Sequence, residues 1–188
     1  MNIIDKIRAN REGLAGFLKE FAVFRTMFED MYPDKAHFLF ELLQNAEDTG
    51  ASEVLFKLKK GSLVFEHNGR PFTEADLEAI TNAGKGTKTE DNDSIGQFGL
   101  GFKAVFAYSN TPYVYSPTLS FKISDFVLPF SIPIIPDLGD RTRFVFEFNS
   151  AKKSPTLAYE EVKGVLEKLP STATLFLKNL KKIEWSID

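Results

Sequence analysis

The segment Ile95-Gly96-Gln97-Phe98-Gly99-Leu100-Gly101-Phe102-Lys103 sets three glycines in a G-x-x-G-x-G order at the start of an apolar run, 102–107. Glycine lets a backbone adopt a positive φ and approach a ligand closely. A glycine-rich turn that opens a helix leaves N–H groups and the positive end of the helix dipole free to bind phosphate. The spacing matches neither the P-loop nor the G-x-G-x-x-G dinucleotide motif. We therefore expect a phosphate site of another type, and the alternative is a tight turn that caps a helix.

Composition limits what else this chain can be. Its 188 residues, 43% hydrophobic and 26% charged, predict one globular domain, and 19 phenylalanines predict an aromatic core. A net charge of −3 gives no electrostatic support for binding nucleic acid. Without cysteine and with two histidines, the chain has neither disulfides nor a thiolate or multi-histidine metal site. It shows no signal peptide and no apolar run of about 18 residues, so we expect a soluble, cytoplasmic domain that binds no membrane.

The apolar periodicity predicts helices and strands in a mixed order. Helices are predicted over 2–10, about 12–30, 34–48 with Asp34 as cap, 73–82 with Thr73 as cap, 102–108 and 155–169. Strands are predicted over 53–59, 62–66, 112–116, 119–124, 142–148, 173–178 and 182–187. This order predicts an α+β fold, a two-layer α/β sandwich with helices on one face of a mixed, mostly antiparallel sheet. The polar, glycine-rich residues 83–95 predict a loop that acts as a lid.

The predicted helix 34–48 carries a polar stripe. At about 100° per residue, Glu41, Asn45 and Asp48 share one side of the helix, apart from the apolar arc formed by Leu39, Leu42, Leu43 and Ala46. The amide oxygen of Asn45 suits Mg²⁺, which keeps most of its waters and uses substrate phosphates. Glu41, one turn away, is placed to orient and deprotonate a water. A solvated helix face is the alternative interpretation of the stripe.

Four short motifs follow one another in an order that resembles a known superfamily. They are Glu41-Leu42-Leu43-Gln44-Asn45, His67-Asn68-Gly69, Gly96-x-x-Gly99-x-Gly101-Phe102 and Arg141-Thr142-Arg143. Together they resemble the GHKL (Bergerat-fold) ATPases, which include gyrase, heat shock protein 90 chaperones, histidine kinases and mismatch-repair ATPases. The first and third motifs are most similar to the heat shock protein 90 branch. The stretches 67–72 and 102–106 resemble its sacsin-like subfamily. The resemblance covers about 35–187.

The resemblance implies that this domain binds ATP and Mg²⁺ through residues at matching positions. Glu41 is implied as the general base, Asn45 as the Mg²⁺ ligand, and Asp48 as a contact to ribose or water. At the base, the implied contacts are His67, Asn68, Gly69 and Thr142. Around the phosphates, the implied residues are Lys85, Gly86 and Thr87 in the lid and Gly96, Gln97, Phe98, Gly99, Leu100, Gly101 and Phe102 in the glycine turn. Lys103 either adds charge near the phosphates or is a solvated helix residue.

One position departs from the family pattern. The family usually has an aspartate where this chain has His67, and that carboxylate accepts the adenine amino group. A neutral imidazole nitrogen also accepts one hydrogen bond, but a protonated one does not. Asn68 is the alternative acceptor, and a plain structural role at the end of a strand is the alternative for His67.

Three functions are compatible with these motifs. The first is an ATPase domain in a chaperone-like or defence-related protein, whose ATP-bound form closes the lid and forms a homodimer, with the N-terminal helices 1–33 as a strap. Its hydrolysis requires a cation from downstream domains of a longer protein, because phosphoryl transfer needs positive charge on the γ-phosphate. The second is a nucleotide sensor that does not hydrolyse, or a degenerate interaction module. The third, a histidine kinase ATP domain, is disfavoured because no phosphoacceptor helix precedes Glu41.

Overall fold

The computed structural model describes residues 2–20, 23, 36–82, 101–169 and 177–188. Its helices are α1 (Ile3–Glu20), α3 (Phe38–Asp48), α4 (Glu74–Ile80) and α5 (Pro155–Leu166), with short 3₁₀ helices η1 (Gly101–Ala107) and η2 (Pro136–Leu138). Its strands are β1 (Glu53–Lys59), β2 (Ser62–His67), β3 (Tyr113–Tyr115), β4 (Phe121–Ser124), β5 (Leu128–Ser131), β6 (Thr142–Glu147) and β7 (Lys182–Ile187). None of these described helices is both long and apolar enough to cross a bilayer.

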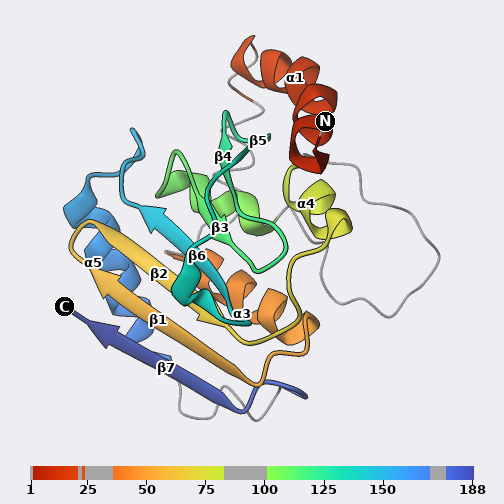
Figure 1. Ribbon diagram of the computed structural model, residues 1–188. Coiled ribbons are helices and arrows are strands. Elements are labelled where there is room, and N and C mark those ends of the chain that lie inside the picture. The colour runs from red at the N-terminus through yellow and green to blue at the C-terminus, as the bar shows by residue number, and fades with distance from the viewer. Residues whose placement is uncertain (1, 21–22, 24–35, 83–100, 170–176) are drawn as a thin grey trace.

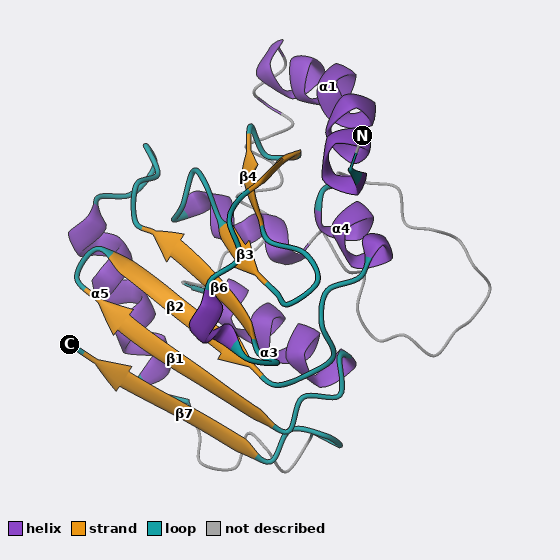
Figure 2. Ribbon diagram, in the orientation of Figure 1, coloured by secondary structure: helices purple, strands orange, loops and turns teal. Residues whose placement is uncertain are grey.

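The described strands form one sheet in the order β5-β4-β3-β6-β2-β1-β7. Each neighbouring pair is antiparallel except β1 and β7, which run parallel. The helices α3 and α5 lie together on one face of the sheet, and α1 packs against β5 and α4 at one end (Figure 1). Figure 2 shows the two layers, with the strands of the sheet in orange and the helices in purple. The predicted α+β sandwich with a mixed, mostly antiparallel sheet is therefore confirmed.

Alternation along the central strands explains the two layers. In β1 the side chains of Val54, Phe56 and Leu58 are buried and their neighbours are less so, as the period of two requires. Phe56 meets Phe65 of β2 with ring centroids 4.7 Å apart, and Phe106 of η1 meets Phe126 at 4.5 Å. Offset aromatic pairs at such distances add to the free energy of area burial. The predicted aromatic core is thus present.

Capping residues set several helix boundaries. The Thr73 hydroxyl accepts from the Asp76 N–H and the Asp76 carboxylate accepts from the Thr73 N–H, which completes a capping box at α4. At α5 the Ser154 hydroxyl accepts from the Leu157 N–H, and Pro155 occupies the first turn. Both starts agree with the sequence prediction. The predicted cap Asp34, the predicted lid and much of the predicted strand 173–178 lie outside the described residues.

Three elements differ from the sequence prediction. Residues 3–20 form one continuous helix, whereas the sequence predicted two helices that separate near position 11; Asn10, Arg11 and Glu12 are all helical. Residues 101–107 form a tight 3₁₀ helix rather than an α-helix, and all seven residues are buried. Strand β5 was not predicted because it contains Pro129, which disfavours a strand assignment; β5 lies at the edge of the sheet, where proline is tolerated.

A carboxylate at the end of α3 holds the final strand in place. The carboxylate of Glu47 accepts three backbone N–H bonds of 2.8 Å each, from Lys178, Asn179 and Leu180. Partial burial opposes ionisation of Glu47, but the three N–H donors outweigh it and lower the pKa of Glu47. This cluster precedes β7 directly, so Glu47 connects the helical layer to the parallel edge strand.

Replacing Glu47 by Gln should destabilise the domain by about 2 kcal/mol, because three charge-assisted hydrogen bonds lose their anion. Glu160→Gln is the matched control, since Glu160 is an exposed residue of α5. Urea unfolding of both variants measures the difference. Equal midpoints for Glu47→Gln and Glu160→Gln would contradict the role assigned to Glu47.

Candidate functional site

The helix α3 presents a polar stripe beside its buried face. Leu39, Leu42 and Ala46 are 0–1% exposed and pack into the core. On the stripe, Glu41 and Asn45 are half-buried and Asp48 is exposed. Burial of part of the Asp48 carboxyl group, together with the charge of Glu47, raises the pKa of Asp48. The structure therefore confirms that the stripe is a face distinct from the apolar arc.

One glycine presses against the Glu41 end of this stripe. A Cβ built on Gly101 would lie 1.9 Å from Glu41 Oε2 and 2.2 Å from Glu41 Cδ. A side chain at position 101 would force the Glu41 carboxylate to move, so glycine is what allows the backbone that opens η1 to meet this carboxylate in its present position. His37, one turn earlier on the chain, has its Nε2 3.7 Å from Glu41 Oε1. Glu41 thus lies between an imidazole and the last glycine of the G-x-x-G-x-G motif.

A second glycine presses against the other end of the stripe. A Cβ on Gly69 would lie 2.1 Å from Thr49 Oγ1 and 3.1 Å from His67 Nδ1. The next residue, Arg70, donates its N–H to the Thr49 carbonyl at 3.0 Å. Two chain segments that are distant in sequence therefore meet α3 at positions 41 and 49, which the helix rise separates by about 12 Å.

His67 is buried at the end of β2. It is 2% exposed, and its ring lies 6.0 Å from that of Phe65 and 6.1 Å from that of Phe144. Its Nδ1 accepts the N–H of Gly69 at 3.2 Å. Burial, with a smaller contribution from the positive charge of Arg70, lowers the pKa of His67 to about 4. The imidazole is therefore neutral at pH 7, with its proton on Nε2.

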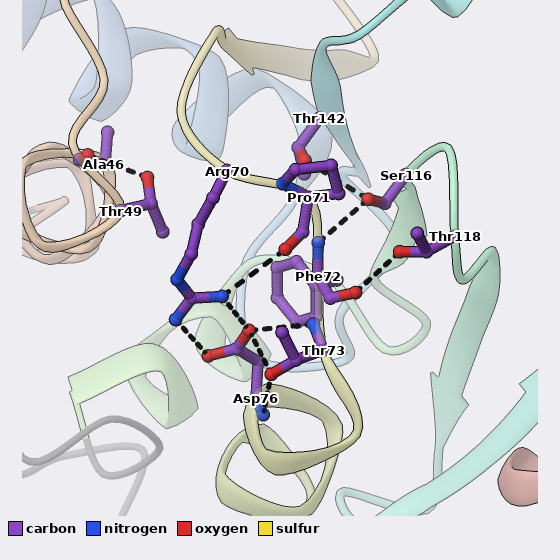
Figure 3. Close-up of polar contacts among 10 residues, drawn as sticks. All are labelled: Ala46, Thr49, Arg70, Pro71, Phe72, Thr73, Asp76, Ser116, Thr118 and Thr142. Atoms are coloured by element: carbon purple, nitrogen blue, oxygen red, sulfur yellow. Dashed lines mark hydrogen bonds and ion pairs between the residues drawn. The ribbon is translucent and has the colours of Figure 1, made fainter.

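Thr142 of β6 lies directly opposite His67 of the neighbouring strand β2. The two residues are partners in the β2–β6 register, and Thr142 is 0% exposed. The hydroxyl of Thr142 donates to Ser116 Oγ at 3.4 Å, and that oxygen also accepts the N–H of Phe72 at 3.0 Å (Figure 3). The sequence prediction missed Ser116, because a lone serine in a short strand region gives no signal of this partnership.

The chain that leaves His67 is held by an ion pair. Arg70 and Asp76 form a two-pronged contact, with one N···O distance of 2.9 Å, and Asp76 also accepts from Thr73 (Figure 3). These bonds outweigh the burial of Asp76 and lower its pKa. Thr118 donates its hydroxyl proton to the carbonyl of Phe72 at 2.6 Å. Residues 70–76 are thus fixed to two neighbouring elements at the His67 end of the site.

Two residues expected at the site are placed differently. Asn68 accepts the N–H groups of Ser52 and Glu53 on Oδ1 and donates from Nδ2 to Ser52 Oγ, so its amide stabilises the turn before β1. The ammonium of Lys103 is 0% exposed and donates to the carbonyls of Ile80 and Phe126, both at 2.7 Å.

Burial, followed by the charge of Arg11, lowers the pKa of Lys103 to about 7. Lys103 is therefore neither a solvated helix residue nor directed to a surface where phosphate binds. Instead it ties η1 to the end of α4. The lysine was assigned wrongly because a charged residue inside a short helix normally reaches water.

Most of the expected lid and phosphate-turn residues belong to the stretch 83–100. Lys85, Gly86, Thr87, Gly96, Gln97, Phe98, Gly99 and Leu100 lie outside the described residues. Of the predicted phosphate turn, Gly101 and Phe102 are described. Phe102 is 2% exposed and packs 6.2 Å from the rings of Phe144 and Phe146, so its side chain belongs to the core.

The described residues do not include three or more His, Cys, Asp or Glu side chains grouped to hold a metal ion. The described residues therefore do not form a metal site in which protein side chains supply most of the ligands. The donor set fits Mg²⁺ instead, because this ion is commonly bound through one or two protein oxygens, with phosphates and waters completing its shell. Asn45 is half-buried on the stripe, and its amide oxygen is the atom that would hold the ion.

Comparison with known proteins finds a family model that matches part of the chain. The model of the family described as "Sacsin domain" matches residues 56–131, which include His67, Gly69 and Gly101. Over this region, called the sacsin-like region below, the chain is similar to the sacsin domain. It is 33% identical over 116 residues to Protein NO VEIN of Arabidopsis thaliana, an alignment that covers 56% of this chain and 4% of that protein. It is 35% identical over 98 residues to Sacsin of Homo sapiens, covering 43% of this chain and 2% of that protein. The chain thus spans a few per cent of these relatives.

The neutral state of His67 makes the stability of the sacsin-like region depend on pH. Unfolded His67 takes up a proton below pH 6.5, whereas folded His67 does so near pH 4. Between these values the unfolded state binds more protons, so stability falls as the pH falls, by on the order of 3 kcal/mol across the window.

Urea unfolding of the wild type and of His67→Gln at pH 7.5, 6, 5 and 4.5 tests this dependence. The variant should lose less stability toward pH 4.5, because all other titrating groups are shared. Parallel pH curves for the two proteins would show that His67 is protonated in the folded state.

Proposed function

We propose that this chain is a Mg²⁺-dependent ATP-binding domain of the GHKL type, whose nucleotide lies along the polar stripe of α3. The observation that carries the proposal is the convergence of Gly69 and Gly101 on positions 49 and 41 of that helix. Glycine at both points lets the end of β2 and the start of η1 pack directly against this helix, so two segments that the motif resemblance assigns to the nucleotide border the polar stripe. The match to the sacsin domain supports a sacsin-like region at 56–131. The choice of ATP as the ligand comes from the motif resemblance to the GHKL ATPases.

Glu41 and Asn45 would act at the triphosphate end. The Glu41 carboxylate, beside His37 Nε2 at 3.7 Å, would accept a proton from an attacking water. The Asn45 amide oxygen would hold Mg²⁺, which supplies positive charge to the phosphates. Gly101 lets the backbone at the start of η1 lie in contact with Glu41, so the end of the proposed phosphate turn would lie beside the base. Asp48 lies one turn further, on the way to the ribose.

His67, Gly69 and Thr142 would receive the base at the other end. His67 and Thr142 face each other across two strands, and Ser116 and Phe72 fix the threonine hydroxyl. Asp76 holds Arg70 and Thr73 by hydrogen bonds, so the polar contacts at this end are already made within the chain. Preorganised polar groups lower the cost of ordering on binding.

A nucleotide sensor that does not hydrolyse is the second candidate. The burial of Lys103 favours it, because the described residues of the motif then bring no ammonium to the γ-phosphate. We propose that hydrolysis, where it occurs, takes its cation from further domains, since the matched relatives are far longer than this chain. In either case nucleotide binding would drive a conformational change or dimerisation.

The Glu41→Gln variant separates these candidates. It should bind Mg·ATP as tightly as wild type and lose turnover by about 100-fold or more, because a general base contributes on that scale. Gly101→Ala should lose turnover similarly while remaining folded, since the displaced atoms are the flexible end of Glu41. Turnover is measured as phosphate release by the full-length protein. Glu160→Gln, at an exposed position of α5, is the control and should keep wild-type turnover. A wild type that binds without turnover supports the sensor, and unchanged turnover in Glu41→Gln refutes the base.

The Asn45→Ala variant tests the Mg²⁺ role. Calorimetric titration with ATP should show that Mg²⁺ strengthens binding to the wild type but not to Asn45→Ala, because the amide oxygen is lost. Asn45→Asp is the matched control, since a carboxylate is also a good Mg²⁺ ligand, and it should retain the Mg²⁺ dependence. If Asn45→Ala responds to Mg²⁺ as the wild type does, Asn45 is not a ligand.

A further inference from the structure

We propose that two copies of this chain associate by pairing their β7 strands edge to edge, antiparallel, about a twofold axis at Trp185. This surface is not part of the proposed nucleotide site. In Figure 1, β7 forms one end of the sheet and α1 packs at the other end. The association therefore needs no nucleotide, and it uses a different surface from dimerisation through the N-terminal helices.

The two edges of the sheet differ in how well they are protected. The edge strand β5 contains Pro129, and α1 packs against it. Proline and a covering helix are two ways in which proteins prevent an edge strand from pairing with another chain. The other edge strand, β7, has six residues and neither proline nor glycine. Among the described residues, no strand pairs with its outer side, so β7 is the edge open to a further strand.

The hydrogen bonds to β1 show which backbone groups of β7 face outwards. Lys182 donates its N–H to the Ser52 carbonyl at 3.1 Å, and Asp188 donates its N–H to the Leu58 carbonyl at 3.0 Å. In a parallel pair, alternate residues of a strand bond the neighbouring strand. The even-numbered residues of β7 therefore bond β1, and the odd-numbered residues direct their N–H and C=O groups away from it. A second strand must bond at these odd-numbered positions.

The side chains at the odd-numbered positions form an apolar row. In the register with β1, Ile183, Trp185 and Ile187 lie on the same face of the sheet as the buried residues of β1. Ile183 and Ile187 pack against the core, whereas Trp185 remains 43% exposed. Tryptophan is enriched where proteins meet, because its ring buries a large apolar area. The middle of the open edge strand thus presents an apolar anchor for association.

One antiparallel register satisfies the backbone, the apolar row and the charges together. It is the register centred on Trp185, whose opposed pairs are Trp185 with Trp185, Ile183 with Ile187, Glu184 with Ser186 and Lys182 with Asp188. The odd-numbered residues, whose backbone groups face outwards, then oppose one another as hydrogen-bonded pairs. The apolar side chains meet on one face of the sheet. On the other face each lysine meets an aspartate, twice because of the twofold axis.

Other registers are less favourable. A register centred on Glu184 places the two Glu184 carboxylates opposite each other, and one centred on Ser186 opposes Glu184 to Asp188 twice. Like charges directly opposite destabilise a strand pair. A slip of one strand by a single residue turns its apolar row to the other face of the sheet. Registers centred nearer an end of β7 pair fewer residues. The sequence of β7 is therefore self-complementary in one register.

Concentration dependence tests the association directly. Because two short strands bury less surface than a standard interface, we expect a weak dimer with a dissociation constant on the order of 10–100 μM. Sedimentation of the 188-residue chain without nucleotide measures this constant. Trp185 is the single tryptophan of the chain, so its fluorescence reports on this surface. Its emission should shift to shorter wavelength as the dimer forms, because the indole leaves water.

Two charge reversals test the register. Lys182→Glu and Asp188→Lys should each weaken self-association by about tenfold, because each variant places like charges opposite each other twice. An equimolar mixture of the two variants should form a heterodimer about as strong as the wild-type dimer, because both opposed pairs are again of opposite charge. Lys6→Glu, which makes the same charge change at an exposed position of α1, should leave self-association unchanged.

Three results would overturn the β7 dimer. The first is a chain that stays monomeric up to roughly 500 μM, well above the expected dissociation constant. The second is a dimer that neither charge reversal weakens, or one that the mixture does not restore, because the contact then lies elsewhere. The third is a dimer that forms with nucleotide and not without it. Each of these results leaves the nucleotide site standing, because that site does not include β7.

Discussion

The close approach of two backbone segments to α3 is the constraint on which the rest of the site depends. Gly69 and Gly101 each lie where any Cβ would overlap an atom of this helix or its cap. Because of these contacts, the end of β2 and the start of η1 are held at opposite ends of one polar stripe. The buried side of α3 packs the helix on the sheet. Glu47, near the end of α3, accepts hydrogen bonds from the residues just before the edge strand β7. One helix therefore organises the core, the last strand and the candidate site.

Much of the fold could be predicted from the sequence. Alternating apolar residues gave β1 and β2 nearly to the residue, and capping residues gave the starts of α4 and α5. The polar stripe of α3 followed from helical geometry alone. In each case the deciding interactions are local, within a few positions along the chain, so the pattern carries the information.

The rest depended on contacts between distant residues, which a single sequence does not show. Lys103 was expected either beside the phosphates or in solvent, but the carbonyls of Ile80 and Phe126 hold its ammonium in the core. Asn68 was expected at the base, but its amide closes a turn. His67 was recognised as a departure from the family pattern, yet its tautomer follows only from the bond to Gly69. The polar groups of the site are thus defined by what the fold has already bound.

The most direct measurement is a crystal structure of this chain with a non-hydrolysable purine triphosphate and Mn²⁺ in place of Mg²⁺, with anomalous scattering recorded from the metal. The account predicts a manganese peak beside the amide oxygen of Asn45, phosphates between Glu41 and the backbone at Gly101, and the base against His67 and Thr142. A metal and nucleotide bound away from α3, or neither bound at saturating concentration, would contradict it.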